Sequence, residues 1–159
     1  MAAKMPFPPI SPYLTVRGGL EAIAFYKKAF GAVRTMLMMA EDKKRVMHAT
    51  LEIGGGTLML SDAFDEYGEM SGTKPPTEAG GASVTVHVEV PDADKVWNKA
   101  VKAGATVVMP LADQFWGARY GKLADPFGHS WSIGGPVKTK PAAAKKKVAK
   151  KKAAKKKKG

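Results

Sequence analysis

The sequence predicts an α+β fold in which two βαβββ modules form a cupped mixed sheet, followed by a disordered tail. Three observations support this. The chain repeats itself at an offset of 73–74 residues, so that Val16 corresponds to Val90 and Gly31 to Gly104. Apolar and polar residues alternate along the expected strands, which indicates sheets with one buried face. Residues 137–159 are mostly lysine and alanine, with almost nothing that could form a core.

The repeat sets the expected boundaries. The folded domain is predicted at residues 8–136, with a first module at about 10–61, a linker at 62–82 and a second module at 83–135. Each module reads as a strand, a helix and then about three strands. A repeat of this length is a structural unit of its own. We therefore expect two similar modules in one compact domain.

In the first module, the strand at 10–16 places Leu14 and Val16 on one face and Ser11, Tyr13 and Thr15 on the other. A helix follows, with an apolar stripe at helical spacing, and Gly31 lies just beyond its end, where a left-handed cap favours glycine. In the strand at 46–53 the apolar face is expected to hold Met47, Ala49, Leu51 and Ile53, and the polar face His48, Thr50 and Glu52.

The second module repeats this pattern. Its first strand, at 83–90, places four valines on one face and Thr85, His87 and Glu89 on the other. Asp92 is the expected N-cap of the helix that ends before Gly104. A turn at 125–128, Asp-Pro-Phe-Gly, joins the last two strands. With the helices on the apolar faces, the polar faces are left to line the cup.

The stretches 10–16, 113–134 and the Ala-Phe-Gly-Ala that ends at residue 32 resemble the vicinal oxygen chelate superfamily. This group includes glyoxalase I, bleomycin-resistance proteins and extradiol dioxygenases, and the most similar branch is the PhnB-like one. The resemblance covers about residues 10–135. It implies the cupped fold and a twofold dimer, but it does not identify the reaction, because one scaffold carries many chemistries.

Metal-dependent members of that superfamily place His and Glu ligands on the first and last strands of each module. By strand position, the corresponding residues here are Ser11, Met59, Thr85 and Ser132. Hydroxyls and a thioether are poor ligands for zinc, nickel, iron or manganese. We therefore expect no metal and no cofactor. A register shift of two residues would bring His87 into the set.

Three groups are candidates for acid–base chemistry: His87, His48 and Asp62. Both histidines lie on the polar faces of their strands, and the ordinary pKa of histidine is near neutrality. The alternative is that all three are ordinary polar residues of the cavity. His129 has the parity of the apolar face, which favours a structural role beside the turn.

A second set suggests ligand binding. Phe115, Trp116 and Tyr120 lie with Arg119 on or beside one strand. Such aromatic residues could stack on a planar ligand, and the arginine could bind its anionic group. The alternative is packing between modules or across a dimer interface. The predicted ligand-binding residues are Tyr13, His48, Thr85, His87, Trp116, Arg119 and Tyr120. The linker, with Phe64, Tyr67 and Met70, is expected to be either a plain connection or a flap over the ligand.

Charge divides the chain into two parts. The segment 138–159 carries 12 lysines and no acidic residue, so its charge of +12 equals the net charge of the whole chain. The rest of the chain is therefore neutral overall. A dense cationic segment attracts polyanions, so a nucleic-acid partner is predicted, although the segment could instead only improve solubility. The residues expected to bind nucleic acid are Lys145, Lys146, Lys147, Lys150, Lys151, Lys152, Lys155, Lys156, Lys157 and Lys158.

Three functions therefore remain open. The protein could be a metal-independent binder of a small organic molecule with a nucleic-acid-binding tail. It could be a lyase or isomerase that uses acid–base chemistry, or a nucleoid-associated protein whose domain is only a dimerising platform. We expect a homodimer in the cytoplasm, with nucleoid association as the alternative. No membrane partner is expected, because no apolar run is long enough to span a bilayer.

Overall fold

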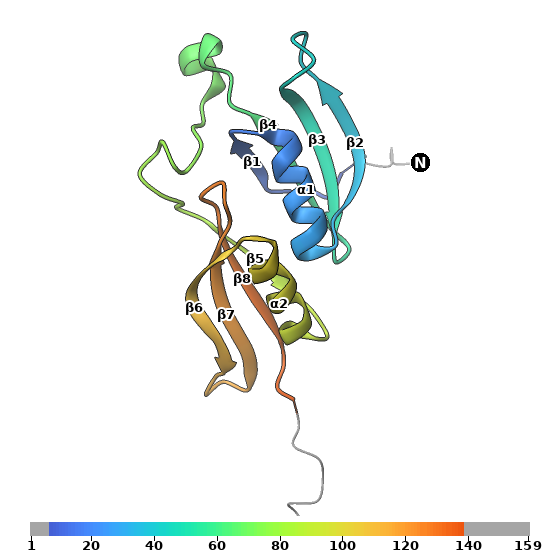
Figure 1. The fold of residues 1–159 in the computed structure, drawn as a ribbon, viewed down its shortest axis with the longest axis vertical. Helices are drawn as coiled ribbons and strands as arrows, with labels where there is room; N and C mark the ends of the chain where they lie inside the picture. Colours follow the sequence, from blue (N-terminus) through green and yellow to red (C-terminus); the bar gives the residue numbers. More distant parts are fainter. Residues whose placement is uncertain (1–6, 139–159) are drawn as a thin grey trace, which may run out of the picture.

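The computed structural model describes residues 7–138. Two βαβββ modules follow one another along the chain, as predicted (Figure 1). The first contains β1 (Tyr13–Val16), α1 (Gly19–Phe30), β2 (Val33–Met39), β3 (Val46–Ile53) and β4 (Gly56–Asp62). A 3₁₀ segment, η1 (Asp65–Ser71), lies in the linker. The second module contains β5 (Thr85–Glu89), α2 (Ala93–Ala103), β6 (Thr106–Asp113), β7 (Ala118–Ala124) and β8 (Ser130–Pro136).

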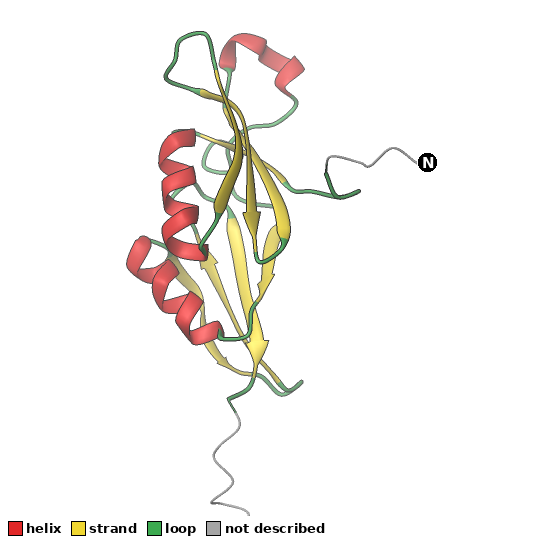
Figure 2. Cartoon of the chain, turned by 90° about the vertical axis from the view of Figure 1, so that its right-hand side faces the viewer, coloured by secondary structure: helices red, strands yellow, loops and turns green. Residues whose placement is uncertain are grey.

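Each module forms a four-stranded mixed sheet. The strand orders are β1-β4-β3-β2 and β5-β8-β7-β6. β1 runs parallel to β4, and β5 runs parallel to β8. Both helices lie on the same side of the two sheets and pack against each other (Figure 2). The α+β fold is therefore confirmed. We call the face of each sheet that is turned away from the helices its open face.

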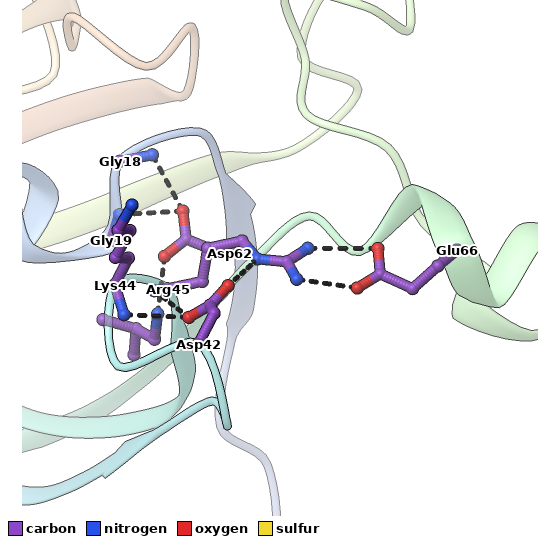
Figure 3. Close-up of polar contacts among 8 residues, drawn as sticks. Gly18, Gly19, Asp42, Lys44, Arg45, Asp62 and Glu66 are labelled. Atoms are coloured by element: carbon purple, nitrogen blue, oxygen red, sulfur yellow. Dashed lines mark hydrogen bonds and ion pairs between the residues drawn. The ribbon is translucent and has the colours of Figure 1, made fainter.

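Asp62, at the end of β4, holds the start of α1. Its Oδ1 accepts hydrogen bonds from the backbone N–H groups of Gly18 and Gly19 at 2.8 and 2.9 Å, and its Oδ2 accepts one from Val46 at 2.7 Å (Figure 3). Gly18 has a φ of 88°, which favours glycine. A Cβ on Gly19 would come within 2.7 Å of both Asp62 and Val46. These contacts fix the helix to the sheet.

The predicted caps are present. Asp92 accepts a hydrogen bond from the backbone N–H of Lys95 at 3.1 Å at the start of α2. Gly31 and Gly104 end the two helices with φ angles of 70° and 117°. Left-handed glycine caps allow the last carbonyl groups of each helix to be satisfied by the backbone.

A buried aromatic cluster joins the two modules. Tyr26 and Phe30 of α1 pack against Trp131 of β8. Their ring centroids lie 5.3 and 4.4 Å, respectively, from the ring centroid of Trp131. The carboxylate of Asp125 lies within this cluster. Its Oδ2 accepts hydrogen bonds from the Tyr26 hydroxyl at 2.7 Å and from the Trp131 indole N–H at 2.8 Å. Asp125 therefore connects a helix of the first module to a strand of the second.

One strand departs from the predicted alternation. Val46 is fully buried against α1, whereas Met47 lines a small cavity of about 170 Å³ with Thr15 and Ser61. The expectation that Met47 shares a face with Ala49 was wrong. The cause is a register shift between β2 and β3 at this point, because a bulge turns the following side chain to the other face.

The linker is attached to the first module by arginines. Arg17 binds Asp65 and Glu78, each at 2.7 Å. Arg45 binds Glu66 at 2.7 Å (Figure 3). Its guanidinium also lies 4.4 Å from the centre of the Phe64 ring. The segment that starts at 62 therefore folds back over the first module.

No helix among residues 7–138 is long and apolar enough to cross a membrane.

Candidate functional site

The open face of the first module contains a tyrosine–histidine pair. The hydroxyl of Tyr13 lies 2.8 Å from Nδ1 of His48, and Nε2 of His48 lies 3.0 Å from the hydroxyl of Thr50. The Tyr13 side chain remains half exposed, and partial burial is the main reason that its pKa is raised. The structure thus brings together two of the predicted ligand-binding residues.

The open face of the second module contains a longer chain of polar contacts. Nδ1 of His87 lies 2.8 Å from the hydroxyl of Ser132, and Nε2 lies 3.1 Å from the carboxylate of Glu89. The ring of Tyr120 stacks on that of His87, with centroids 6.0 Å apart. Thr85 lies beside them, with its hydroxyl 2.9 Å from that of Ser130.

The two faces are related by the internal repeat. Tyr13 pairs with Met59 across β1 and β4, and His87 pairs with Ser132 across β5 and β8. These are equivalent positions in the two modules. In the same register, His48 of β3 corresponds to Tyr120 of β7. Each open face therefore holds one histidine and one tyrosine, but the two residue types exchange places between the modules.

A cavity of about 470 Å³ lies where the modules meet. Its walls come from residues 8–12, the β3–β4 turn and β5, and they include Ile10, Ile53 and Val86. His87 and Glu89 also line it and supply polar groups. Ligand pockets are typically of this size, mostly apolar, and carry a few polar groups that orient the ligand.

The exposed aromatic residues extend from the second open face. Trp116, in the β6–β7 turn, lies edge-on to Tyr120 with ring centroids 5.9 Å apart, and its side chain is 53% exposed. Phe115 is 97% exposed and contacts Trp116. The predicted group of Trp116, Tyr120 and His87 is therefore brought together.

Arg119 lies elsewhere. It makes two hydrogen bonds of 2.7 Å to Asp94 at the start of α2, and a third of 2.9 Å to Asp113. This side chain points to the helix side of the sheet, opposite to its neighbour Tyr120. The guanidinium holds the pKa of Asp94 down at about 2. Arg119 thus joins a helix to the sheet and is not placed to bind an anion beside His87.

Two other predicted residues have structural contacts. Both oxygens of Asp62 are occupied by three backbone N–H groups, so this carboxylate anchors α1. His129 lies at the junction of the modules, where its Nε2 is 3.1 Å from the backbone oxygen of Thr15. Its backbone N–H donates to Asp125 at 2.9 Å.

The residues at the centre of the open faces do not fit a transition metal. Ser11 precedes β1, so that Tyr13 occupies the place opposite Met59, and His87 rather than Thr85 lies opposite Ser132. Of these four side chains only His87 is a common metal ligand. Within residues 7–138, no three His, Asp or Glu side chains form a group that could hold a metal.

Comparison with known proteins identifies the family. Residues 13–133 match the Glyoxalase/Bleomycin resistance protein/Dioxygenase superfamily. The chain belongs to this superfamily. It is 48% identical over 133 residues to an uncharacterised protein of Mycobacterium tuberculosis, and the match covers 82% of this chain and 76% of the relative.

Several solved structures share the fold. TioX from Micromonospora sp. ML1 is 25% identical with a TM-score of 0.61, over 84% of this chain and 99% of TioX. A structure from Bacillus cereus described as a putative 3-demethylubiquinone-9 3-methyltransferase, PhnB protein, has a TM-score of 0.60 over 80% of this chain and 97% of that one. At 20% identity, this second likeness concerns the fold alone.

Sequence reasoning did not single out Glu89 or Gly134. Strand alternation placed Glu89 on the same face as His87, which was the available signal. Gly134 had no signal in the sequence. The need for glycine at this position is seen only in the folded structure, where a Cβ would collide with Glu89 and come within 2.7 Å of the His87 ring.

Proposed function

We propose that this superfamily member binds a small, planar organic molecule without a metal, at the open face of the second module and the adjoining cavity. The observation that carries the proposal is the junction cavity, whose lining combines apolar residues with His87 and Glu89. Tyr120 stacks on His87, and Trp116 follows it. Aromatic side chains arranged in this way stack readily on a flat ligand.

Native mass spectrometry of the purified protein tests this proposal. A retained small molecule should be lost or weakened in Trp116→Ala, because removal of a stacking ring costs about 1 kcal/mol or somewhat more. Phe115→Ala is the matched control, because this neighbouring ring is more exposed and contacts Trp116, whereas Trp116 contacts Tyr120. Equal retention by both variants and the parent would make the aromatic group structural.

The first module's predicted residues, Tyr13 and His48, lie on a separate open face of the same chain. A second copy of the chain could bring such a face opposite the second module of its partner. Met36, Met38 and Val84 are large apolar side chains that remain exposed. We therefore expect a homodimer, and closed twofold symmetry is the commonest arrangement of soluble oligomers. Light scattering at high micromolar concentration tests it, and a monomer would contradict it.

The lysine-rich segment supports a second activity, non-specific binding of nucleic acid. Its predicted contact residues, from Lys145 to Lys158, lie outside the described residues. The supporting observation is that all 12 net positive charges fall in 138–159. Each duplex phosphate neutralised contributes about −0.9 to the slope of log affinity against log salt. Deletion of 137–159 should abolish binding of duplex DNA in fluorescence anisotropy, and a deletion variant that still binds at moderate salt would refute the assignment.

A further inference from the structure

We propose that one face of α2 is a contact surface for double-stranded DNA and that it acts together with the lysine-rich segment 138–159. The face consists of Lys95, Lys99 and Lys102, which we call the α2 lysine stripe. The inference rests on the proposed binding of nucleic acid by the lysine-rich segment. It adds a surface on the folded domain and names the partner as duplex DNA.

The three lysines lie on one side of the helix. They are separated by four and then three residues, which is the spacing of neighbours along one face of an α-helix. The opposite face carries Ala93 and Ala100, which are buried. All three lysines are exposed. Because α2 lies on the helical side of the second sheet (Figure 2), the stripe faces solvent away from both open faces.

The charges of the stripe are not neutralised by the domain. Within residues 7–138, none of its three lysines forms an ion pair. In contrast, Arg17, Arg45 and Arg119 each bind carboxylates. Like charges four residues apart destabilise a helix. A polyanion on this face would remove the repulsion, so the stripe fits a binding role better than a structural one.

The lysine-rich segment leaves the domain beside the stripe. Nζ of Lys138 lies 3.3 Å from a carboxylate oxygen of Asp94 and 3.8 Å from one of Asp92, at the start of α2. The end of β8 packs closely there, since a Cβ on Gly135 would lie 3.2 Å from the Cβ of the first residue of α2. The first lysine of the segment therefore contacts the same helical turn that carries Lys95.

One duplex can contact both elements. The stripe is about 10 Å long, because an α-helix rises about 1.5 Å per residue. Duplex DNA carries one phosphate charge per about 1.7 Å of its axis, so several phosphates fall within this length. A duplex held by the lysine-rich segment meets the stripe at a high effective concentration. Non-specific affinity grows with the number of phosphates neutralised, so three lysines add to the binding by the segment but do not replace it.

The composition of α2 favours DNA over an anionic membrane. A helix that lies on a membrane buries large apolar side chains among the lipids beside its basic ones. Val96 and Trp97 of α2 pack against the core of the domain instead, and of the large apolar side chains of α2 Val101 alone is exposed. Lysine contacts to phosphate carry no base information, so we expect no sequence preference.

The test measures binding of the full-length protein to a short, fluorescein-labelled duplex of random sequence, by fluorescence anisotropy over a range of salt concentrations. The stripe variant carries Lys95→Gln, Lys99→Gln and Lys102→Gln. The matched control removes the same charge from exposed lysines of the β2–β3 turn and the linker, with Lys43→Gln, Lys44→Gln and Lys74→Gln. Each lost phosphate contact lowers the slope of log affinity against log salt by about 0.9, so the stripe variant should bind more weakly, with a slope shallower by up to about 2.7.

The outcomes separate this surface from the lysine-rich segment. Weaker binding and a shallower slope in the stripe variant alone, with both restored by arginine at the same three positions, support the surface. Equal binding by the parent and both variants overturns it and leaves the segment's activity standing. Equal losses in both variants also overturn it, because they show a general effect of charge.

Two further results complete the test. If the stripe variant loses binding to vesicles of phosphatidylserine and phosphatidylcholine but keeps the parent's binding to the duplex, the stripe contacts a membrane and the DNA surface is wrong. If the full-length parent does not bind the duplex, both proposals fail. The melting temperature by circular dichroism should be unchanged in the stripe variant, because all three side chains are exposed.

Discussion

Removal of the hydroxyl of Tyr26 tests whether Asp125 joins the two modules. In Tyr26→Phe the Asp125 carboxylate keeps its contact with Trp131 but loses a hydrogen bond of 2.7 Å from a fully buried donor. A hydrogen bond to a charged group contributes about 1.5–3 kcal/mol. The variant should therefore lose about 2 kcal/mol of unfolding free energy, a large fraction of the stability of a typical domain.

Tyr13→Phe provides the matched control, because it deletes the same atom from a half-exposed side chain that contacts His48. The loss there should be below about 1 kcal/mol, because water replaces the missing partner. Urea unfolding followed by circular dichroism measures both values. If Tyr26→Phe costs no more than Tyr13→Phe, the buried carboxylate does not hold the modules together, and the aromatic packing alone must do so.

Three further predictions concern Asp62, the ion pair between Asp94 and Arg119, and the expected absence of a metal. Asp62→Ala should destabilise the protein by about 2 kcal/mol or more in urea unfolding, because three backbone N–H groups lose their acceptor; an unchanged midpoint would argue against its anchoring role. The pKa of Asp94 is lowered from 3.8 to about 2, so its pair with Arg119 stabilises the fold above pH 4 and loses this effect as the pH falls towards 2. The stability difference between the parent and Asp94→Asn, at most about 1 kcal/mol for a partly exposed pair, should therefore shrink over that interval, and a difference that grows on acidification would contradict the assignment. Chelation should leave the melting temperature unchanged, and purified protein should contain far less than one equivalent of transition metal, whereas metal retained in stoichiometric amount would contradict the metal-free proposal.

The internal repeat made most of the fold predictable. Gly31 and Gly104 recur at the helix ends, and the alternation of the second module's first strand separated His87 and Glu89 from the valines of its other face. These features depend on local periodicity and capping, which a single sequence carries. The order of strands within each sheet was not predicted, because it depends on pairing between segments far apart in the sequence.

The errors came from interactions between distant segments. The bulge near Val46 arises from pairing with β2, so alternation within β3 alone misplaced Met47. Arg119 lies on the helix side of the sheet because it binds Asp94, which lies 25 residues earlier, on α2. Asp62 was a candidate for catalysis because its carboxylate was expected in the cup, whereas the fold brings the start of α1 to it.

The central claim is that the second module's open face and the adjoining cavity bind a planar organic molecule. The most direct measurement is an NMR titration of the full-length protein with a library of planar aromatic fragments, observing the histidine and tryptophan ring signals. The chain has three of each, so every signal can be assigned by substitution. We predict saturable shifts at His87 and Trp116, with the buried Trp131 and the junction residue His129 little affected. Fragments that bind only near His129, or no saturable shift at His87 and Trp116, would contradict the claim.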